Sequence, residues 1–203
     1  MSLQSRAVTM TKQMIQIEST DPGTYENAMA DWITTQLAPY PNVRLSSQEV
    51  LPGRPNLIAE LTGDPSLPAL VMICHMDTVV VGDGWTLPPF DAIEKDGKIY
   101  GRGACDMKSG LACCLSAFQY AAETLQTSGK TPKQTLKLIC SMDEEDFMRG
   151  SEACIQAGWV TDHDWVIDAE PTNGQIQMAH KGRTWYEIDV QGHTAHASTP
   201  WKG

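Results

Sequence analysis

The sequence predicts an α/β fold in which helices cover both faces of a sheet. Apolar residues recur at helical spacing in several segments, and short apolar runs of strand length separate these segments. Helical and strand segments alternate along the chain, which is typical of a sheet with helices packed on it. At 203 residues, the chain has room for one domain and part of a second.

Two helices and three strands make up the first part of the predicted order. The helices span residues 4–17 and 23–37, where apolar side chains repeat with a helical period, and Asp21-Pro22-Gly23 forms the turn between them. The strands follow at residues 43–50, 56–61 and 70–74. The last of these is an unbroken apolar run, as expected for a strand that is buried on both faces.

A long loop rich in glycine and proline, residues 75–105, precedes the second part, and Asp96-Gly97 within it suits a tight hairpin turn. The later elements are predicted helices at 107–126 and 151–157 and predicted strands at 135–142 and 165–168. Residues 183–191 alternate like a half-exposed strand. We therefore place a domain boundary near Ala179, with a first domain of residues 1–179 and a second of residues 180–203.

Composition narrows the possible partners. Hydrophobic residues make up 41% of the chain and charged residues 20%, as in folded proteins. The net charge of −10 argues against a nucleic acid partner, because phosphate binding needs a basic surface. Residues 1–17 lack the pattern of a secretory signal, and the longest apolar run, residues 67–74, is too short to cross a bilayer. We therefore expect no membrane partner.

The six cysteines do not form an obvious disulfide framework. Cys113 and Cys114 are adjacent in a predicted helix, while Cys74 and Cys140 stand at the ends of apolar strands. The chain has no paired C-x-x-C motifs, which argues against a thiolate zinc site. We expect buried free thiols in a reducing cytoplasm.

Side chains that can bind metals or transfer protons gather in four segments beside predicted strand ends and helix starts. The segments are residues 74–77, 101–110, 143–146 and 168–172. In open α/β sheets, ligands bind outside the carboxyl ends of the strands. The placement of these segments therefore predicts one shared site. The candidate residues are His75, Asp77, Asp106, Glu144, Glu145 and Glu170.

These residue types fit the chemistry of divalent metals. A histidine nitrogen and carboxylate oxygens form a normal zinc shell at about 2.0–2.2 Å, and two metals about 3.5–4 Å apart can share a carboxylate. Carboxylates packed together without a cation would repel one another. His75 and Asp77 support the hypothesis, because alternate strand residues point to one side and a metal-bound imidazole needs a partner on its other nitrogen.

Each signal also has a plainer interpretation. His75 alone would be a hydrogen-bonded structural histidine, and the acidic run 143–146 alone would be a solvated turn. Asp106 could be only the N-cap of the helix that begins near Met107. The metal hypothesis depends on these segments meeting at one place.

Taken together and in this order, the segments resemble the zinc peptidase and amidohydrolase family that includes aminoacylase, acetylornithine deacetylase, succinyl-diaminopimelate desuccinylase and carboxypeptidase G. The matching stretches are His75-Met76-Asp77-Thr78-Val79, Trp85 with Pro89-Phe90, residues 96–104, Asp106-Met107-Lys108, Asp143-Glu144-Glu145, Glu170-Pro171-Thr172, His180-Lys181-Gly182 and residues 192–198. The resemblance implies a three-layer, zinc-exopeptidase-like catalytic domain at residues 1–179, incomplete in this chain. It also implies the start of an α+β, ferredoxin-like lid and dimerisation domain at residues 180–203.

The resemblance implies a dinuclear zinc site. His75 and Glu170 would bind one ion, Glu145 would bind the other, and Asp106 would bridge the two. Co²⁺ or Mn²⁺ could substitute for Zn²⁺. In the family, the second zinc takes a further histidine from near the C-terminus of a chain about twice this length. We therefore expect an incomplete sheet with an exposed edge, and little activity from these 203 residues alone.

The resemblance also implies three catalytic roles. Glu144 would be the general base that takes a proton from the attacking water and passes it to the leaving amine. Asp77 would orient His75. His196 would reach the site of the partner subunit in a homodimer and stabilise the oxyanion there, although a helix-start residue in a small domain is its plainer interpretation. Two departures, at Val80 and in Asp146-Phe147-Met148, fall where the family usually has proline and glycine.

The implied function is a cytoplasmic metal-dependent hydrolase, a metallopeptidase or deacylase, that cleaves the amide bond of a small peptide or N-acyl amino acid. Deacylase, desuccinylase, dipeptidase and carboxypeptidase activities all stay open. One alternative is a non-catalytic relative that serves as a binding or dimerisation module, and another is a hydrolase with a single metal. Glu144, together with all four local ligand positions, favours the enzyme.

Overall fold

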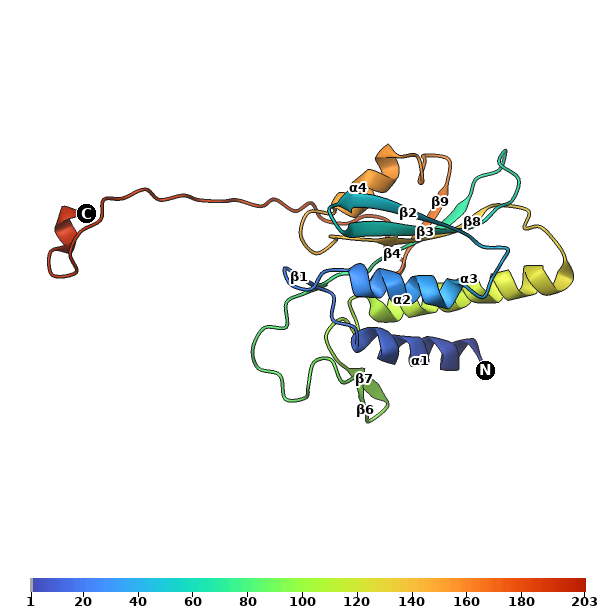
Figure 1. Ribbon diagram of the computed structural model, residues 1–203, viewed down its shortest axis with the longest axis horizontal. Helices are drawn as coiled ribbons and strands as arrows, with labels where there is room; N and C mark the ends of the chain where they lie inside the picture. The colour runs from blue at the N-terminus through green and yellow to red at the C-terminus, as the bar shows by residue number, and fades with distance from the viewer. Residues whose placement is uncertain (1) are drawn as a thin grey trace. The chain divides into compact units, whose positions relative to one another are not determined.

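The computed structural model describes residues 2–203 and divides after Pro171 into two units, which are described separately (Figure 1). The first unit contains α1 (Leu3–Ile15), β1 (Thr20–Asp21), α2 (Asn27–Leu37), β2 (Arg44–Leu51), β3 (Arg54–Leu61), β4 (Leu70–His75), β5 (Thr78–Val79), β6 (Ile93–Lys95), β7 (Lys98–Tyr100), α3 (Lys108–Ser128), β8 (Leu136–Ser141), α4 (Arg149–Gln156) and β9 (Trp165–Asp168). The second unit contains one short 3₁₀ helix, η1 (Pro200–Lys202).

A five-stranded mixed sheet of order β2-β3-β8-β4-β9 forms the centre of the first unit. β3 is antiparallel to β2 and β8, whereas β4 is parallel to both β8 and β9. The register pairs His75 with Ser141 and Ile73 with Asp168. The carboxyl ends of β4, β8 and β9 therefore lie at the same edge of the sheet.

Helices cover both faces of this sheet, which confirms the predicted α/β class. Figure 1 shows α2 and α3 on one face and α4 on the other, with α1 packed outside α3. Strand residues alternate between the two faces: Leu57, Ala59 and Leu61 join the core under α2 and α3, and Ile58 joins the smaller core under α4. The apolar run of β4 divides in the same way, because Met72 and Cys74 face α3 while Val71 faces α4.

Two predictions about local structure have opposite outcomes. Asp96 and Gly97, both with positive φ, form the two-residue turn between β6 and β7, as the tight-hairpin prediction requires. The predicted strand at residues 183–191 is wrong, because these residues have no regular secondary structure. A strand needs a neighbour to pair with its backbone groups, and within the described chain no ladder includes this segment.

A buried lysine joins α3 to the segment that follows α1. Lys108 in the first turn of α3 is fully buried, and its Nζ donates to the carbonyl oxygen of Ile17 at 2.7 Å. Burial lowers the pKa of Lys108 to about 7.

In the part of the chain that the structure describes, no helix has the length and apolarity needed to cross a membrane.

Asn56 joins β3, β8 and α4 through a fully buried side chain. Its Nδ2 donates to the carbonyl oxygen of Gly150 at 2.9 Å, and its Oδ1 accepts from the backbone amide of Met142 at 3.0 Å. These two bonds satisfy backbone groups on either side of the loop that carries Glu144. A side chain at Gly150 would disturb these contacts, since an added Cβ would lie 2.3 Å from the carbonyl oxygen of Met142 and 2.6 Å from Oδ1 of Asn56.

We expect Asn56→Ala to lower the free energy of unfolding by about 2–4 kcal/mol, because two buried backbone groups would lose their partners. Urea denaturation followed by circular dichroism measures this change. Asn42→Ala is the matched control: Asn42 makes one partly buried bond, from Nδ2 to the carbonyl oxygen of Ala122, and should cost about 1 kcal/mol. Equal losses from the two variants would contradict the assignment.

Candidate metal centre

Parallel strand ends bring His75 and three glutamates together. His75 is the last residue of β4 and is buried. Glu144 and Glu145 follow β8, and Glu170 follows β9 by two residues. Because β4, β8 and β9 run in the same direction, the segments that follow them leave the sheet at the same edge. Asp106 reaches this edge from the loop before α3.

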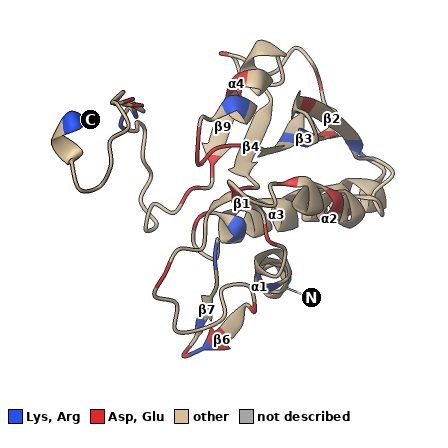
Figure 2. Ribbon diagram, turned by 60° about the vertical axis from the view of Figure 1, so that its left-hand side comes forward, with Lys and Arg blue, Asp and Glu red and all other residues tan. Residues whose placement is uncertain are grey.

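The side chains meet at the Nε2 atom of His75. This atom lies 3.1 Å from Oδ1 of Asp106, 3.4 Å from Oε1 of Glu170 and 4.0 Å from Oε2 of Glu144. In two groups, His75–Asp106–Glu145 and His75–Glu144–Glu170, each residue offers one ligand atom within 4.8 Å of the others. The structure therefore brings together five of the residues that the sequence analysis singled out. Acidic residues, red in Figure 2, occur at the end of β9 and in the segments around β1.

The other ring nitrogen of His75, Nδ1, contacts Asp77. Nδ1 lies 2.9 Å from the carbonyl oxygen of Asp77 and 3.6 Å from its carboxylate. Burial lowers the pKa of His75, but hydrogen bonds to Asp106 and Asp77 outweigh burial and raise the pKa well above its usual value. Both ring nitrogens of His75 thus face oxygen atoms. Nε2 faces the carboxylates, while Nδ1 makes the second contact that orients a metal-binding imidazole.

Burial and mutual repulsion act on the carboxylates of the site. Burial raises the pKa of Glu170 to about 8; the His75 ring opposes this effect, while Asp106 and Asp168 add to it. Burial and the charge of Asp106 raise the pKa of Glu145 as well. His75 and the carboxylates lie close enough together to hold a divalent cation, whose charge would offset the repulsion between the carboxylates.

Asp77 also binds the backbone of the glutamate pair, a contact that the sequence did not predict. Its fully buried carboxylate accepts hydrogen bonds from two backbone amides, from Glu144 to Oδ1 at 3.1 Å and from Glu145 to Oδ2 at 3.0 Å. The same residue thus holds the ring of His75 and the backbone of the glutamate pair. The sequence offers no local signal for this contact, since the partners are 67 and 68 residues apart.

Gly110 in the first turn of α3 sets the place of Glu170. An added Cβ at Gly110 would lie 2.3 Å from the carbonyl oxygen of Ala169, closer than real contacts allow. Only glycine lets the helix approach the segment after β9 this closely. The close approach brings Glu170 to the same side of the sheet edge as Asp106.

His196 belongs to the second unit. Its ring Nδ1 accepts a hydrogen bond from the amide of Ser198 at 3.2 Å and lies 2.9 Å from the hydroxyl of that residue. Its predicted role at a partner subunit's site stays a prediction, as does the domain boundary near Ala179.

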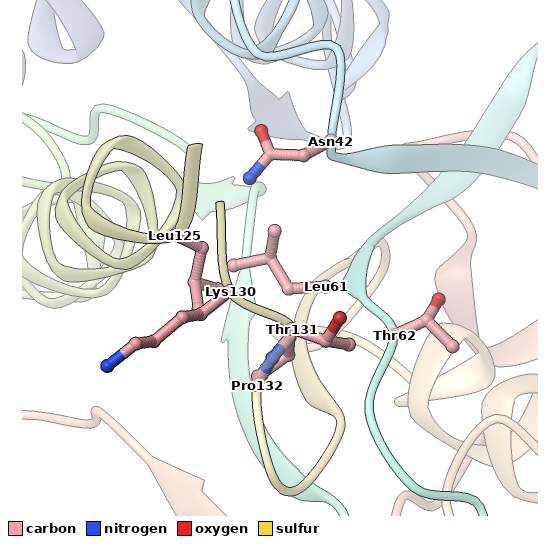
Figure 3. Close-up of a pocket in the computed structure, with 7 residues that line it drawn as sticks. All are labelled: Asn42, Leu61, Thr62, Leu125, Lys130, Thr131 and Pro132. Carbon is pink, nitrogen blue, oxygen red and sulfur yellow. The ribbon is translucent and has the colours of Figure 1, made fainter. Parts of the chain in front are cut away.

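A separate pocket lies at the opposite end of the sheet (Figure 3). It has a volume of about 170 Å³, and its lining includes Asn42, Leu61, Leu125 and Pro132. Leu61 ends β3, and Pro132 precedes β8. This pocket therefore stands at the amino end of β8, whereas the metal-ligand candidates follow its carboxyl end.

We expect Gly110→Ala to weaken the binding of Co²⁺ by about 10- to 100-fold, the range for changes to groups that position metal ligands. The methyl group would push the Ala169-Glu170 segment away from His75 and Asp106. Titration with Co²⁺, followed by visible absorption, measures the affinity. Ser109→Ala, a change in the same helical turn, should leave the affinity unchanged; equal affinity of all three proteins would contradict the positioning argument.

Comparison with known proteins gives relatives of similar sequence. The chain is 38% identical over 152 residues to a probable succinyl-diaminopimelate desuccinylase of Staphylococcus aureus, covering 74% of this chain and 36% of the relative. It is 33% identical over 183 residues to an acetylornithine deacetylase of Proteus mirabilis, covering 87% of this chain and 43% of the relative. The chain thus spans well under half the length of these relatives.

Solved structures resemble the fold. An M20 family metallo-carboxypeptidase from Sulfolobus solfataricus matches with a TM-score of 0.63 and 21% identity, over 80% of this chain and 37% of that one. The aminopeptidase PepT from Bacillus cereus matches with a TM-score of 0.61 and 24% identity, over 81% of this chain and 43% of that one. At sequence identities of 21% and 24%, these matches show a shared fold and no more.

The family assignment comes from a family model that spans the whole candidate site. The model of the peptidase family M20/M25/M40 matches residues 71–201, a range that begins in β4 and includes all the candidate ligands. The chain belongs to the M20/M25/M40 peptidase family.

Proposed function

We propose that this chain carries the metal-binding part of a hydrolase that cleaves amide bonds of small peptides or N-acyl amino acids at a dinuclear zinc site. The observation that carries the proposal is the convergence of Asp106, Glu145 and Glu170 on the Nε2 edge of His75. Membership of a peptidase family and relatives named as a desuccinylase and a deacetylase support amide hydrolysis.

Four residues would hold the metals. His75 and Glu170 would bind one ion, Glu145 the other, and Asp106 both. The exposed side of Asp106 supports a bridging position, since its carboxylate is the least buried of those around His75. When bound, the ions would supply Lewis acidity to the scissile carbonyl and to the attacking water.

A side chain of the protein would transfer the proton of the attacking water. Glu144 would accept a proton from the attacking water and deliver it to the nitrogen of the leaving amine, as a general base and then a general acid. Its backbone is fixed by Asp77, and its carboxylate is partly exposed, so that it can reach a water at the site. Glu144 is also close enough to His75 and Glu170 to act as a metal ligand; its assignment as the base rests on the family resemblance.

Three further parts of the proposal rest mainly on resemblance. The second unit would mediate a homodimer, and His196 would stabilise the oxyanion in the partner subunit's site. Zinc would be the native metal, with Co²⁺ and Mn²⁺ as substitutes. A reducing cytoplasm suits the buried free thiols of Cys74, Cys114, Cys140 and Cys154. The relatives named above carry the names of hydrolases, so the non-catalytic alternative is not favoured.

Metal binding tests the first part of the proposal. We expect Zn²⁺ to raise the melting temperature of the chain, because a ligand that binds only the folded state stabilises it by about 2.7 kcal/mol at a concentration of 100 Kd. Asp106→Asn should reduce this gain for both ions, and Asp162→Asn, at an exposed residue, should not. Differential scanning calorimetry with and without a chelator measures the effect. A melting temperature that zinc leaves unchanged would exclude the metal centre.

The role of Glu144 has its own test. In the protein with its complete site, Glu144→Gln should lower kcat by about 10²- to 10⁴-fold, the usual contribution of general acid–base catalysis, while metal content stays constant. Hydrolysis of N-acyl amino acids and elemental analysis give the two measurements. Glu152→Gln, at an exposed position in α4, is the matched control. Loss of metal in Glu144→Gln would instead identify Glu144 as a ligand.

A further inference from the structure

A buried ion-pair network lies next to the metal centre and has no part in the roles above. Its centre is Arg54, the first residue of β3, which is only 8% exposed. The guanidinium donates from Nε to Oε2 of Glu26 at 2.8 Å and from Nη2 to Oδ2 of Asp21 at 2.5 Å, and Nη2 also donates to Oε1 of Glu26. Oδ1 of Asp143 lies 3.5 Å from Nη2. The ring of Tyr25 covers the guanidinium, with 4.2 Å between its centroid and Cζ.

Glu26 connects this network to the segment that carries the glutamate pair. Its Oε1 accepts a hydrogen bond from the backbone amide of Asp143 at 3.1 Å. The next two amides, those of Glu144 and Glu145, donate to the carboxylate of Asp77. Three consecutive amides after β8 are thus held by buried carboxylates from other elements. The segment lies between β8 and α4, so these three amides depend on side-chain acceptors and not on a helix or strand ladder.

The backbone at Asp143 needs such support. Asp143 has a φ of 63°, in the left-handed region, which costs a residue other than glycine roughly 1–2 kcal/mol. Its carboxylate accepts from Nε and Nη2 of Arg149, both at 2.6 Å, and from the Arg149 amide at 3.2 Å. The left-handed turn directs the following residues, Glu144 and Glu145, toward His75.

Charge explains why an arginine is needed in this place. Asp21, Glu26 and Asp77 are buried, and each offers an oxygen within 4.8 Å of the others. Arg54 supplies the positive charge that contacts Asp21 and Glu26. Removing one partner of a buried ion pair leaves an uncompensated charge, which is strongly destabilising. Without Arg54, Glu26 would turn toward water and release the amide of Asp143.

We propose that Arg54 and Glu26 are positioning residues that fix Glu144 and Glu145 at the metal centre through the backbone of Asp143. The proposal rests on the proposed function, because it assigns the pair to the geometry of that site. Neither residue belongs to the groups that offer ligand atoms around His75. It acts by holding the chain in the one conformation that presents both glutamates to His75.

The experiment measures Co²⁺ affinity, the visible spectrum of bound Co²⁺ and the melting temperature of the metal-free protein. We expect Arg54→Met to weaken Co²⁺ binding by at least tenfold, as for other groups that orient metal ligands, and to alter the spectrum, which reports ligand geometry. Arg6→Met is the matched control, since Arg6 also pairs with a carboxylate, Glu123, at 3.0 Å. Glu123 lies roughly 22 Å along α3 from Lys108, at 1.5 Å per residue, and this variant should bind Co²⁺ normally.

Glu26→Gln gives a result even if Arg54→Met fails to fold. The side chain keeps its size, but its amide nitrogen must face a donor in either orientation, because both carboxylate oxygens of Glu26 accept hydrogen bonds. We expect about tenfold weaker Co²⁺ binding and a lower melting temperature, with a smaller fall than in Arg54→Met because Arg54 keeps Asp21 as a charged partner. Unchanged affinity in this variant would overturn the proposal.

A double variant separates positioning from stability. Arg54→Met with Glu26→Leu removes both charges of the pair, and such replacements often restore stability; here Asp21 still loses its partner. We expect the melting temperature to recover in part relative to Arg54→Met while Co²⁺ binding stays at least tenfold weaker. Recovery of the affinity together with the melting temperature would show that the pair only stabilises the fold, and would overturn the proposal. If the unchanged chain itself bound no Co²⁺, the proposed function would fail first.

Discussion

Repulsion between carboxylates is the constraint around which this end of the sheet is organised. Four strand-end and loop segments bring acidic side chains to one edge, where partial burial weakens the screening of their charges by water. On the side of β3 and α4, arginines meet this charge: Arg54 contacts Glu26 and Asp21, and Arg149 clamps Asp143. On the side of His75, the ring of that residue faces Asp106 and Glu170, and the charge of Arg102 also acts on Asp106. The carboxylates paired with arginine thus stabilise the fold, whereas those around His75 can bind a metal ion.

The parallel part of the sheet provides the framework for this arrangement. β4 pairs with β8 and β9 in register, so that the residues after each strand leave the sheet together. Asp77 then joins the segment after β4 to the segment after β8, and Gly110 allows α3 to approach the segment after β9. Hydrogen bonds and one close approach thus convert a shared sheet edge into a defined site.

Sequence patterns could predict most of the fold and the gathering of the site residues. Long amphipathic helices and unbroken apolar strands have strong periodic signals, and α3, β4 and β8 fall within two residues of their expected bounds. The sequence predicts that His75 and the glutamates meet, because they stand at or just after the ends of predicted strands. The contacts that fix them were not predictable in this way, because Arg54, Glu26 and Asp77 act across tens of residues. The strand expected at residues 183–191 shows the complementary failure, since an alternating pattern cannot form a strand without a neighbour.

The double attachment of Asp77 has a consequence for how the site responds to mutation. One carboxyl-bearing residue supports the imidazole through its carbonyl and carboxylate, and supports the backbone of the glutamate pair through the same carboxylate. Histidine and glutamates are therefore mechanically coupled, although they come from different strands. Substitutions on the two sides should show free energies of interaction well away from zero in double-mutant cycles. A substitution that moves His75 should therefore also move Glu144 and Glu145, because all three are attached to Asp77.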